Sequence, residues 1–423
     1  MPRSVFILLS LSLIGMVFGS SCNRSSSPSG RWKVEAAEKP YLILISLDGF
    51  RWDYVERFHP PHLSQFIAEG VQAKSLIPSF PSKTFPNHYT VATGMYPDKH
   101  GLIANTFYSY AKDTTYIIRD RSLVEDSDFY RGTPIWVHAS KAGMVTASYF
   151  FVGTEAKIQG TRPDYYFNYD GSVPNDERVR QALEWLSYPK SKRPQLITMY
   201  FSDMDNIGHG FGPNNDQQLQ TGLMRLDSTL GKLFDGIKAT KLPVNVLIVS
   251  DHGMLEVPVE KYLPQEKLEN DALYRTVSNG ALVSIHPHDP AQTDSIFQLL
   301  QNKADHYQIY KTEDCPLFEA PPTDPNWGSL QIIPEDGHYF IWYRGLSIKK
   351  KSTNTRFGEH GFDPNLLELH GIFYANGPAF KAGYTLPPIK NIHVYPLMCE
   401  ILGLEVPEDV DGELNATVKA LKN

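Results

Sequence analysis

The hydrophobic pattern of this chain alternates between short, almost unbroken apolar runs and longer segments with helical periodicity or helix-start signals. The apolar runs predict strands buried on both faces, as in a parallel sheet; they span residues 41–47, 145–151, 196–201 and 244–250. The helical segments lie between them, at residues 62–70, 134–143, 176–188 and 216–238. This alternation predicts an α/β fold with a doubly wound, mostly parallel sheet flanked by helices.

Residues from about 261 to 350 change this pattern, because prolines and charged residues become frequent there. Two strand-like runs, 281–285 and 339–343, flank a helical stretch at 292–303. The change predicts a small inserted α+β subdomain within a folded domain that spans residues 39–423. The histidines of the insertion lack ligand partners at informative spacing, so we assign them to surface or packing positions: His286, His288, His306 and His338.

The amino terminus reads as an export signal: Met-Pro-Arg, then the apolar run 5–18, then Gly-Ser-Ser-Cys22. The run is too short for a membrane-spanning helix. Small residues before Cys22 also resemble a bacterial lipoprotein signal, although Gly19 stands where such signals usually carry a leucine. Cys22 would then be the lipidated first residue of the mature chain; the alternative is ordinary cleavage nearby, which leaves a soluble periplasmic protein.

We therefore expect residues 1–21 to be removed and the Ser-rich, polar residues 22–38 to form a flexible tether. The expected location is the periplasm or, for a lipoprotein, the outer membrane or cell surface, with membrane contact only through the lipid at Cys22. Cys315 and Cys399 are too few for a disulfide framework or a paired-cysteine zinc site. One disulfide bridge and two separate buried thiols both remain open for this pair.

The formal net charge of -7 over 423 residues makes the chain mildly acidic. Such a chain is a poor candidate for binding nucleic-acid polymers through diffuse basic charge. If the protein handles phosphate groups, local metals or helix dipoles must bind them. The chain has no glycine loop of the P-loop or dinucleotide-binding type.

Acidic or imidazole side chains follow three of the predicted strands: Asp48; Asp203, Asp205 and His209; and Asp251 with His252. In doubly wound sheets, ligands gather beyond the carboxyl ends of the strands. Carboxylates and imidazoles together are suited to a metal centre. An Asp-Gly pair after a strand is also ordinary turn chemistry, so it is the recurrence at successive strand ends that predicts a metal site. His360 lies on a loop expected to approach this site, whereas His370 is expected to be a packed or supporting histidine.

The run 81–94 carries a hydroxyl, Thr84, two residues before Pro86. Proline is tolerated in a first helical turn, because its missing N–H would be unpaired there. Thr84 is therefore expected at or near a helix N-cap, where free N–H groups and the helix dipole favour an anion such as phosphate. The alternative is that Thr84 only caps the helix.

Six segments, in order and spacing, resemble the nucleotide pyrophosphatase/phosphodiesterase family of the alkaline phosphatase superfamily, over about residues 41–412. The segments are ISLDGFR at 45–51, KTFPNHYT at 83–90, GMYPDKHG at 94–101, DxxGH at 205–209, SDHG at 250–253, and EHGFD at 359–363 with GPAF at 377–380. The resemblance implies an alkaline phosphatase-like fold and hydrolysis of phosphodiester or pyrophosphate bonds in nucleotides, releasing nucleoside monophosphates.

The resemblance also implies residue roles and two Zn²⁺ ions. Thr84 would be the nucleophile and, with Asp48, Asp251 and His252, would hold one zinc; Asp205, His209 and His360 would hold the second. Asn105 would donate to a phosphate oxygen, while Phe85 and Tyr200 would line the nucleobase site; Asp203 receives no ligand role. In the implied two-step reaction Thr84 attacks phosphorus and water then hydrolyses the phospho-threonine ester, with the Phe85 N–H and the Asn105 amide steadying the developing charge.

Alternatives remain at this point. A phosphomonoesterase of the same superfamily would need a cation for the extra charge of its substrate; Lys157 and Arg162 lie in a segment that resembles the diesterase pattern, which favours diesters. A phosphodiesterase for choline or glycerol lipid headgroups is the other alternative, because Phe85 and Tyr200 could pack in the core or contact a headgroup instead of stacking a base. A non-catalytic metal-binding lipoprotein is disfavoured, since no ligand or nucleophile is missing.

Overall fold

The structure, a computed structural model, describes residues 40–335 and 337–422. The predicted export signal, Cys22 and the predicted tether lie outside the described residues. Among the described residues, no helix combines the length and the apolar character needed to cross a membrane. Cys315 and Cys399 are both buried and unbridged. Burial raises the pKa of the Cys315 thiol to about 11 and that of Cys399 to about 12, so both are expected to be unreactive at neutral pH.

A central eight-stranded sheet has the order β19-β2-β18-β9-β1-β8-β6-β7. Its strands are β1 (Tyr41–Leu47), β2 (Val71–Ala73), β6 (Thr146–Tyr149), β7 (Tyr165–Phe167), β8 (Leu196–Phe201), β9 (Val244–Val249), β18 (Phe373–Asn376) and β19 (Tyr384–Leu386). All neighbours pair in parallel except β18, which runs antiparallel to β9 and β2. The predicted α/β class with a mostly parallel sheet is confirmed.

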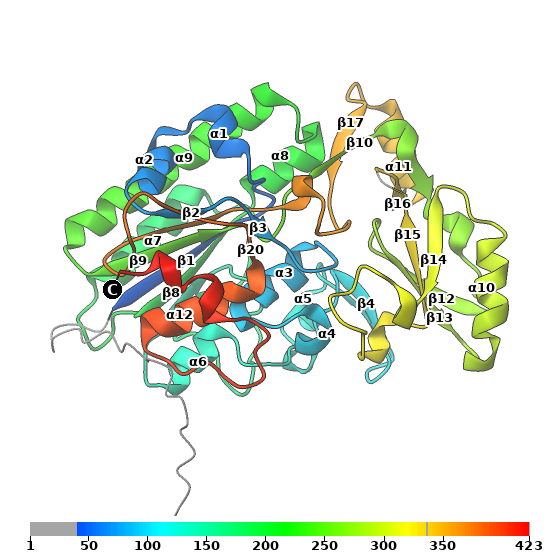
Figure 1. The fold of residues 1–423 in the computed structure, drawn as a ribbon, viewed down its shortest axis with the longest axis horizontal. Coiled ribbons are helices and arrows are strands. Elements are labelled where there is room, and N and C mark those ends of the chain that lie inside the picture. The colour runs from blue at the N-terminus through cyan, green and yellow to red at the C-terminus, as the bar shows by residue number, and fades with distance from the viewer. Residues whose placement is uncertain (1–39, 336, 423) are drawn as a thin grey trace, which may run out of the picture. The chain divides into compact units, whose positions relative to one another are not determined.

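Helices cover both faces of the sheet (Figure 1). One face carries α2 (Pro61–Ala68), α7 (Asn175–Ser187) and α9 (Asp216–Thr240), and the other carries α3 (Thr84–Thr93), α6 (Ile135–Lys141) and α12 (Val394–Leu402). Strand β1 shows why the sequence folds this way, because all seven of its residues are buried. Leu42 and Leu44 pack in the cluster of α3, α6 and α12, and Ile43 and Ile45 pack in the cluster of α2, α7 and α9.

Shorter elements complete this part of the chain. The helices are α1 (Tyr54–Phe58), α4 (Pro97–His100), α5 (Arg121–Val124) and α8 (Asp203–Phe211). Three two-stranded sheets pair β3 (Leu76–Ile77) with β20 (Ile389–Lys390), β4 (Thr106–Ser109) with β5 (Thr114–Ile117), and β10 (Leu255–Pro258) with β17 (Arg356–Glu359).

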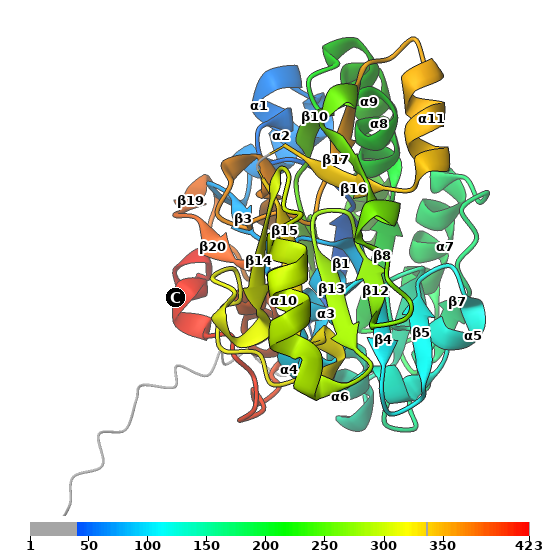
Figure 2. The same cartoon turned by 90° about the vertical axis from the view of Figure 1, so that its right-hand side faces the viewer.

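The region predicted as an insertion contains a separate four-stranded antiparallel sheet in the order β12-β13-β15-β14. Its strands are β12 (Tyr274–Ser278), β13 (Val283–Pro287), β14 (Tyr307–Lys311) and β15 (Leu330–Pro334). Helix α10 (Thr293–Gln301) packs Ile296 and Leu300 onto this sheet (Figure 2). Strand β16 (Tyr339–Ile341) does not join it but pairs in parallel with β11 (Tyr262–Pro264), ahead of helix α11 (Tyr343–Lys351).

Candidate active site with two metal-binding clusters

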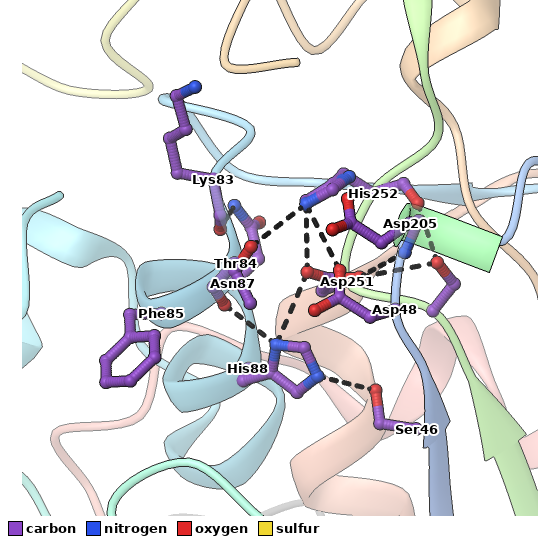
Figure 3. Close-up of polar contacts among 12 residues, drawn as sticks. Ser46, Asp48, Lys83, Thr84, Phe85, Asn87, His88, Asp205, Asp251 and His252 are labelled. Atoms are coloured by element: carbon purple, nitrogen blue, oxygen red, sulfur yellow. Dashed lines mark hydrogen bonds and ion pairs between the residues drawn. The ribbon is translucent and has the colours of Figure 1, made fainter. Parts of the chain in front are cut away.

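Two groups of potential metal ligands lie beyond the carboxyl ends of β1, β8 and β9, with one member supplied by the residue after β17. Figure 3 shows the carboxylates of both groups together with His252. The first group is Asp48, Asp251 and His252, and the second is Asp205, His209 and His360. Within each group, one ligand atom per residue lies within 4.8 Å of the others. Thr84 aside, the six side chains predicted from the sequence as metal ligands therefore lie together in the structure.

A glycine joins the two groups. Gly49 follows Asp48 with a φ of +62°, a conformation that favours glycine. A Cβ atom on Gly49 would lie 2.7 Å from the Asp205 Cα, so only glycine allows helix α8 to come so close. The Asp205 N–H then donates to the Asp48 carbonyl oxygen at 3.0 Å. The Asp-Gly turn therefore does more than end a strand, because it places Asp205 beside Asp48.

The three histidines share one orientation. Each uses Nδ1 to contact a backbone carbonyl oxygen at 2.8 Å: His209 that of Gly358, His252 that of Gly253 and His360 that of Ser82. Because a carbonyl can only accept, Nδ1 carries a proton, and in the neutral ring the Nε2 lone pair is left free for a metal ion. His252 Nε2 lies 3.0 Å from Asp251 Oδ2, and His209 Nε2 lies 3.3 Å from Asp205 Oδ1. Metal-ligating histidines are typically held in this way.

The carboxylates carry negative charge without enough donors to satisfy it. Asp48 Oδ1, Asp205 Oδ1 and Asp251 Oδ2 are buried, and within the described part of the chain none of them accepts a hydrogen bond. Burial, together with repulsion from Asp251 and Asp205, raises the pKa of Asp48 well above its usual value. Although burial lowers the pKa of His209, the adjacent Asp205 carboxylate raises it to about 9. Buried unpaired carboxylates are costly, so the donor set fits bound divalent cations.

Thr84 is the first residue of α3 and follows Lys83, whose backbone is extended. The helix has no side-chain cap hydrogen bond, so the alternative that Thr84 only caps the helix is not what the structure shows. Its Oγ1 instead lies 3.4 Å from His252 Nε2, on the side of the first cluster (Figure 3). The hydroxyl and the ligand groups therefore face the same space.

His88 is a buried site residue to which the sequence analysis gave no role. It lies one helical turn after Thr84, and its Nε2 forms a hydrogen bond with Ser46 Oγ at 2.8 Å. Its Nδ1 contacts the Thr84 carbonyl oxygen at 2.8 Å and lies 3.3 Å from Asp251 Oδ2. The available signal was the i, i+4 spacing from Thr84, which puts both residues on one helix face. His88 thus links α3 to the carboxylate of Asp251.

Tyr200 differs from its predicted position in a nucleobase site. It lies on β8, is 9% exposed, and its hydroxyl donates to Asp48 Oδ2 at 2.5 Å. Its buried ring meets the rings of His88 and Tyr169 at steep angles. The structure makes Tyr200 a support for the Asp48 carboxylate, because a tyrosine hydroxyl buried on this strand needs a hydrogen-bond partner.

Phe85 and Asn105 are hydrogen-bonded to each other. The Phe85 N–H donates to Asn105 Oδ1 at 2.9 Å, so the two predicted phosphate donors are not both free. The Phe85 ring is half-buried and points away from the carboxylates (Figure 3). The carboxylate of Asp203 is bonded to a residue outside the two clusters: Asn175 Nδ2 donates to both of its oxygens, at 2.9 and 2.8 Å. This agrees with its exclusion as a metal ligand.

Lys83 is a second residue that the sequence analysis missed. It directly precedes Thr84, is 4% exposed, and donates through Nζ to Tyr339 Oη of β16 at 2.9 Å. Burial lowers the pKa of Lys83 to about 8, against the opposing effects of Glu359 and Asp205. The Lys83–Tyr339 contact joins the nucleophile segment to β16, and the sequence offered no signal for a pair so distant along the chain.

Comparison with known proteins agrees with this geometry. The sequence profile of the family "Type I phosphodiesterase / nucleotide pyrophosphatase" matches residues 42–363. The chain is 32% identical to human ectonucleotide pyrophosphatase/phosphodiesterase family member 1 over 95% of its own length and 43% of that protein's. It is 29% identical to the human family member 5, covering 86% of this chain and 74% of that protein. The chain thus spans less than half the length of family member 1.

Solved structures show the same relationship. The murine ectonucleotide pyrophosphatase/phosphodiesterase 5 superposes with a TM-score of 0.82 and 27% identity, covering 90% of this chain and 100% of that one. An inactive threonine-to-alanine form of that murine protein, in complex with AMP, superposes with the same TM-score of 0.82. Because the family profile spans most of the described residues, the chain belongs to the type I phosphodiesterase / nucleotide pyrophosphatase family.

Proposed function

We propose that this protein is a zinc-dependent enzyme that hydrolyses phosphodiester or pyrophosphate bonds in nucleotides and releases nucleoside monophosphates. The observation that carries the proposal is the position of Thr84 Oγ1, 3.4 Å from His252 Nε2, beside two clusters whose buried carboxylate oxygens lack hydrogen-bond donors. The names of the relatives, and the AMP complex of the inactive murine variant, support nucleotides as the substrate class.

In this proposal Asp48, Asp251, His252 and Thr84 hold one Zn²⁺, and Asp205, His209 and His360 hold the second. Mixed carboxylate and imidazole donors suit zinc. When bound, the two ions would make the threonine alkoxide accessible and offset charge on the attacking and leaving oxygens of an in-line displacement. The Nδ1 hydrogen bonds of the three histidines support the proposal, because they fix each Nε2 toward its cluster.

Thr84 carries the covalent step. Its deprotonated Oγ1 forms a bond to phosphorus while the bond to the alcohol or phosphate leaving group breaks, which gives a phospho-threonine ester. Water then attacks the same phosphorus, frees the nucleoside monophosphate and restores the threonine. In this proposal the Asn105 amide N–H donates to a non-bridging oxygen, while its Oδ1 accepts from the Phe85 N–H. The Phe85 N–H can bind the same phosphate group only after it leaves Asn105 Oδ1.

Diesters are favoured over monoesters by the surroundings of the two candidate cations. Arg162 donates to Tyr166 Oη at 3.4 Å and lies over that ring, while Lys157 is exposed. Among the described residues, the contacts of Arg162 are with Tyr166 and not with Thr84 or the ligand groups, whereas a dianionic ester would be bound by a cation beside the nucleophile. Lys83 is the cation beside Thr84, and its ammonium is already bonded to Tyr339.

The central test is Thr84→Ala. We expect the variant to lose turnover of bis-p-nitrophenyl phosphate because it lacks the nucleophile, while zinc measured by mass spectrometry stays at about two per chain. Thr84→Ser is the matched control and should retain part of the activity. Wild-type protein should cleave the diester faster than p-nitrophenyl phosphate; a clear monoester preference, or full activity in Thr84→Ala, contradicts the proposal.

A substrate panel then separates nucleotides from lipids. We expect the purified mature protein to release AMP from ATP or from a dinucleotide, and to act more slowly on a lysophospholipid; a cyclic dinucleotide tests ring opening. Faster cleavage of the lysophospholipid would place the enzyme among lipid headgroup phosphodiesterases. Export and lipidation at Cys22 belong to the same proposal, and mass spectrometry of the mature amino terminus tests them, since an unmodified residue there rules the lipid out.

A further inference from the structure

Three residues of the region predicted as an insertion form a group outside the active site: His306, Glu335 and His338. His306 precedes β14, Glu335 follows β15 and His338 precedes β16. From sequence alone the two histidines are expected at surface or packing positions, because their spacing along the chain gives no ligand partner. The structure supplies the partner through strand pairing, since Tyr307 lies opposite Pro334 in the β14–β15 ladder.

Backbone hydrogen bonds fix the three positions relative to one another. The Glu335 N–H donates to the His306 carbonyl oxygen at 2.9 Å, and the His338 N–H donates to the Glu335 carbonyl oxygen at 2.8 Å. His306 has a φ of +60°, which is uncommon for a residue with a side chain. These backbone contacts therefore hold the three residues side by side, with their side chains near one point.

The side chains converge as a ligand set. The rings of His306 and His338 are stacked, with centroids 4.3 Å apart and 10° between the planes. His306 Nδ1 lies 3.3 Å from Glu335 Oε2, and one ligand atom of each residue lies within 4.8 Å of the others. His338 Nδ1 is buried and has no hydrogen-bond partner among the described residues. A buried imidazole nitrogen without a partner is a polar group in need of a ligand.

We propose that His306, Glu335 and His338 form a further binding site for a divalent transition-metal ion of the zinc class, separate from the active-site clusters. Two imidazoles and one carboxylate, with water in the remaining position, are a usual donor set for such an ion. Zinc–ligand bonds of about 2.1 Å require ligand atoms about 3.4 Å apart in a tetrahedral site. His306 and Glu335 are 53% and 52% exposed, so their side chains are free to rotate by the amount needed.

Nearby charges set the expected affinity. Asp305 Oδ1 lies 3.6 Å from His306 Nε2 and favours a cation. The Lys261 ammonium has the opposite effect on cation binding. It lies close to the site, since a Cβ on Gly337, the residue before His338, would lie 3.1 Å from Lys261 Nζ. We therefore expect weaker binding than at the active-site clusters.

A bound ion would connect β14 and β15 to the start of β16. Tyr339, the residue after His338, accepts the hydrogen bond from Lys83 beside Thr84. The proposed site is therefore joined through one residue to the segment that carries the nucleophile. This connection gives the ion a structural role at the edge of the active site, without contact to substrate.

The test uses full-length mature protein without a histidine tag, with its active-site clusters already loaded. Titration with Zn²⁺ in a calorimeter should show one additional ion per chain at micromolar concentration in the wild type, and none in His306→Asn/His338→Asn. His288→Asn, at an exposed histidine of the same region, is the matched control and should behave as the wild type. Equal stoichiometry in the wild type and the double variant, or binding only at millimolar Zn²⁺, overturns the proposal.

A spectroscopic readout makes the result independent of activity. Cu²⁺ added to the loaded protein should give an electron paramagnetic resonance spectrum with nitrogen couplings from two imidazoles, reduced to one in either single variant. His288→Asn, at the exposed histidine of the same region, should leave this signal unchanged. An unchanged spectrum in both single variants would show that the two histidines do not bind the ion, whatever the outcome for the proposed hydrolysis.

Discussion

Single hydrogen bonds determine how the ligand side chains are presented. Tyr200 Oη donates to one oxygen of Asp48 and leaves the other, Oδ1, without a donor and facing the first cluster. The Gly49 N–H acts in the same manner on Asp251, donating to Oδ1 at 3.1 Å and leaving Oδ2 without a hydrogen-bond donor, 3.3 Å from His88 Nδ1. Such supporting residues orient ligands and typically change metal affinity 10- to 100-fold when removed.

Tyr200→Phe tests this reading of Tyr200 against a role in base stacking. The variant keeps the ring and loses the hydroxyl, so we expect zinc affinity to fall by roughly 10- to 100-fold, with a matching loss of activity at limiting zinc. Metal titration followed by activity at saturating zinc measures both effects. Tyr149→Phe, at a buried tyrosine of the neighbouring strand β6, is the control. Unchanged zinc affinity in Tyr200→Phe would contradict the supporting role.

At the level of elements, a loop of the predicted insertion holds the segment that leads into α3. The Phe80 N–H donates to Glu319 Oε1 at 2.7 Å, and the Phe80 ring meets Phe318 edge-on at 5.4 Å. Burial raises the pKa of Glu319 to about 7, against the lowering effect of the Phe80 N–H. A glutamate carboxyl in an unfolded chain has a pKa of about 4.3, so the folded protein binds the Glu319 proton more tightly than the unfolded chain does.

The linked prediction concerns stability against pH. Between about pH 4.5 and pH 7 the folded state binds more protons at Glu319 than the unfolded state, so this residue makes stability fall as pH rises through that window. In Glu319→Gln this component disappears. Urea unfolding at pH 5 and pH 8 should therefore show the wild type losing stability relative to Glu319→Gln as pH rises. The exposed Glu313→Gln is the control, and a difference that does not vary with pH would count against the raised pKa.

For the whole molecule, the carboxyl ends of three strands are held together around uncompensated charge. Asp48, Asp205 and Asp251 follow β1, β8 and β9, and each has a buried oxygen without a hydrogen-bond donor. Cations that bind only the folded state would stabilise this arrangement by mass action, by about 2.7 kcal/mol for each ion present at 100 times its Kd. Metal binding is therefore expected to contribute to folding stability as well as to catalysis.

Removal of metal tests that expectation. Dialysis against a chelator should lower the melting temperature by several degrees, because the buried carboxylates then repel one another, and addition of Zn²⁺ should restore it. Thermal unfolding of loaded, stripped and reloaded protein at one pH makes the comparison. Asp205→Asn should show a smaller difference between the loaded and stripped forms. Identical melting of the loaded and stripped wild type would argue against cations at these clusters.

The sequence by itself determined strands β1, β6, β8 and β9 of the central sheet, helices α2, α6, α7 and α9, and the order of the main ligand residues. Strand β1 was predictable because it is an almost unbroken apolar run, interrupted only by Ser46, and is buried on both faces. Asp48, Asp251 and His252 were predictable because they closely follow strands. These are local signals, set by hydrophobic pattern and by position relative to a strand end. Asp205, His209, His360 and Thr84 were also candidates by position, and the family motifs added their division into two metal sites and a nucleophile.

Only the tertiary structure decided contacts between distant segments. The sequence placed Tyr200 in a base site, but the pairing of β8 beside β1 turns its hydroxyl to Asp48. The antiparallel β18, the Lys83–Tyr339 contact and the group of His306, Glu335 and His338 likewise depend on which strands become neighbours. Strand pairing depends on burial summed over the whole sheet rather than on any local pattern, so these features cannot be read from residue spacing.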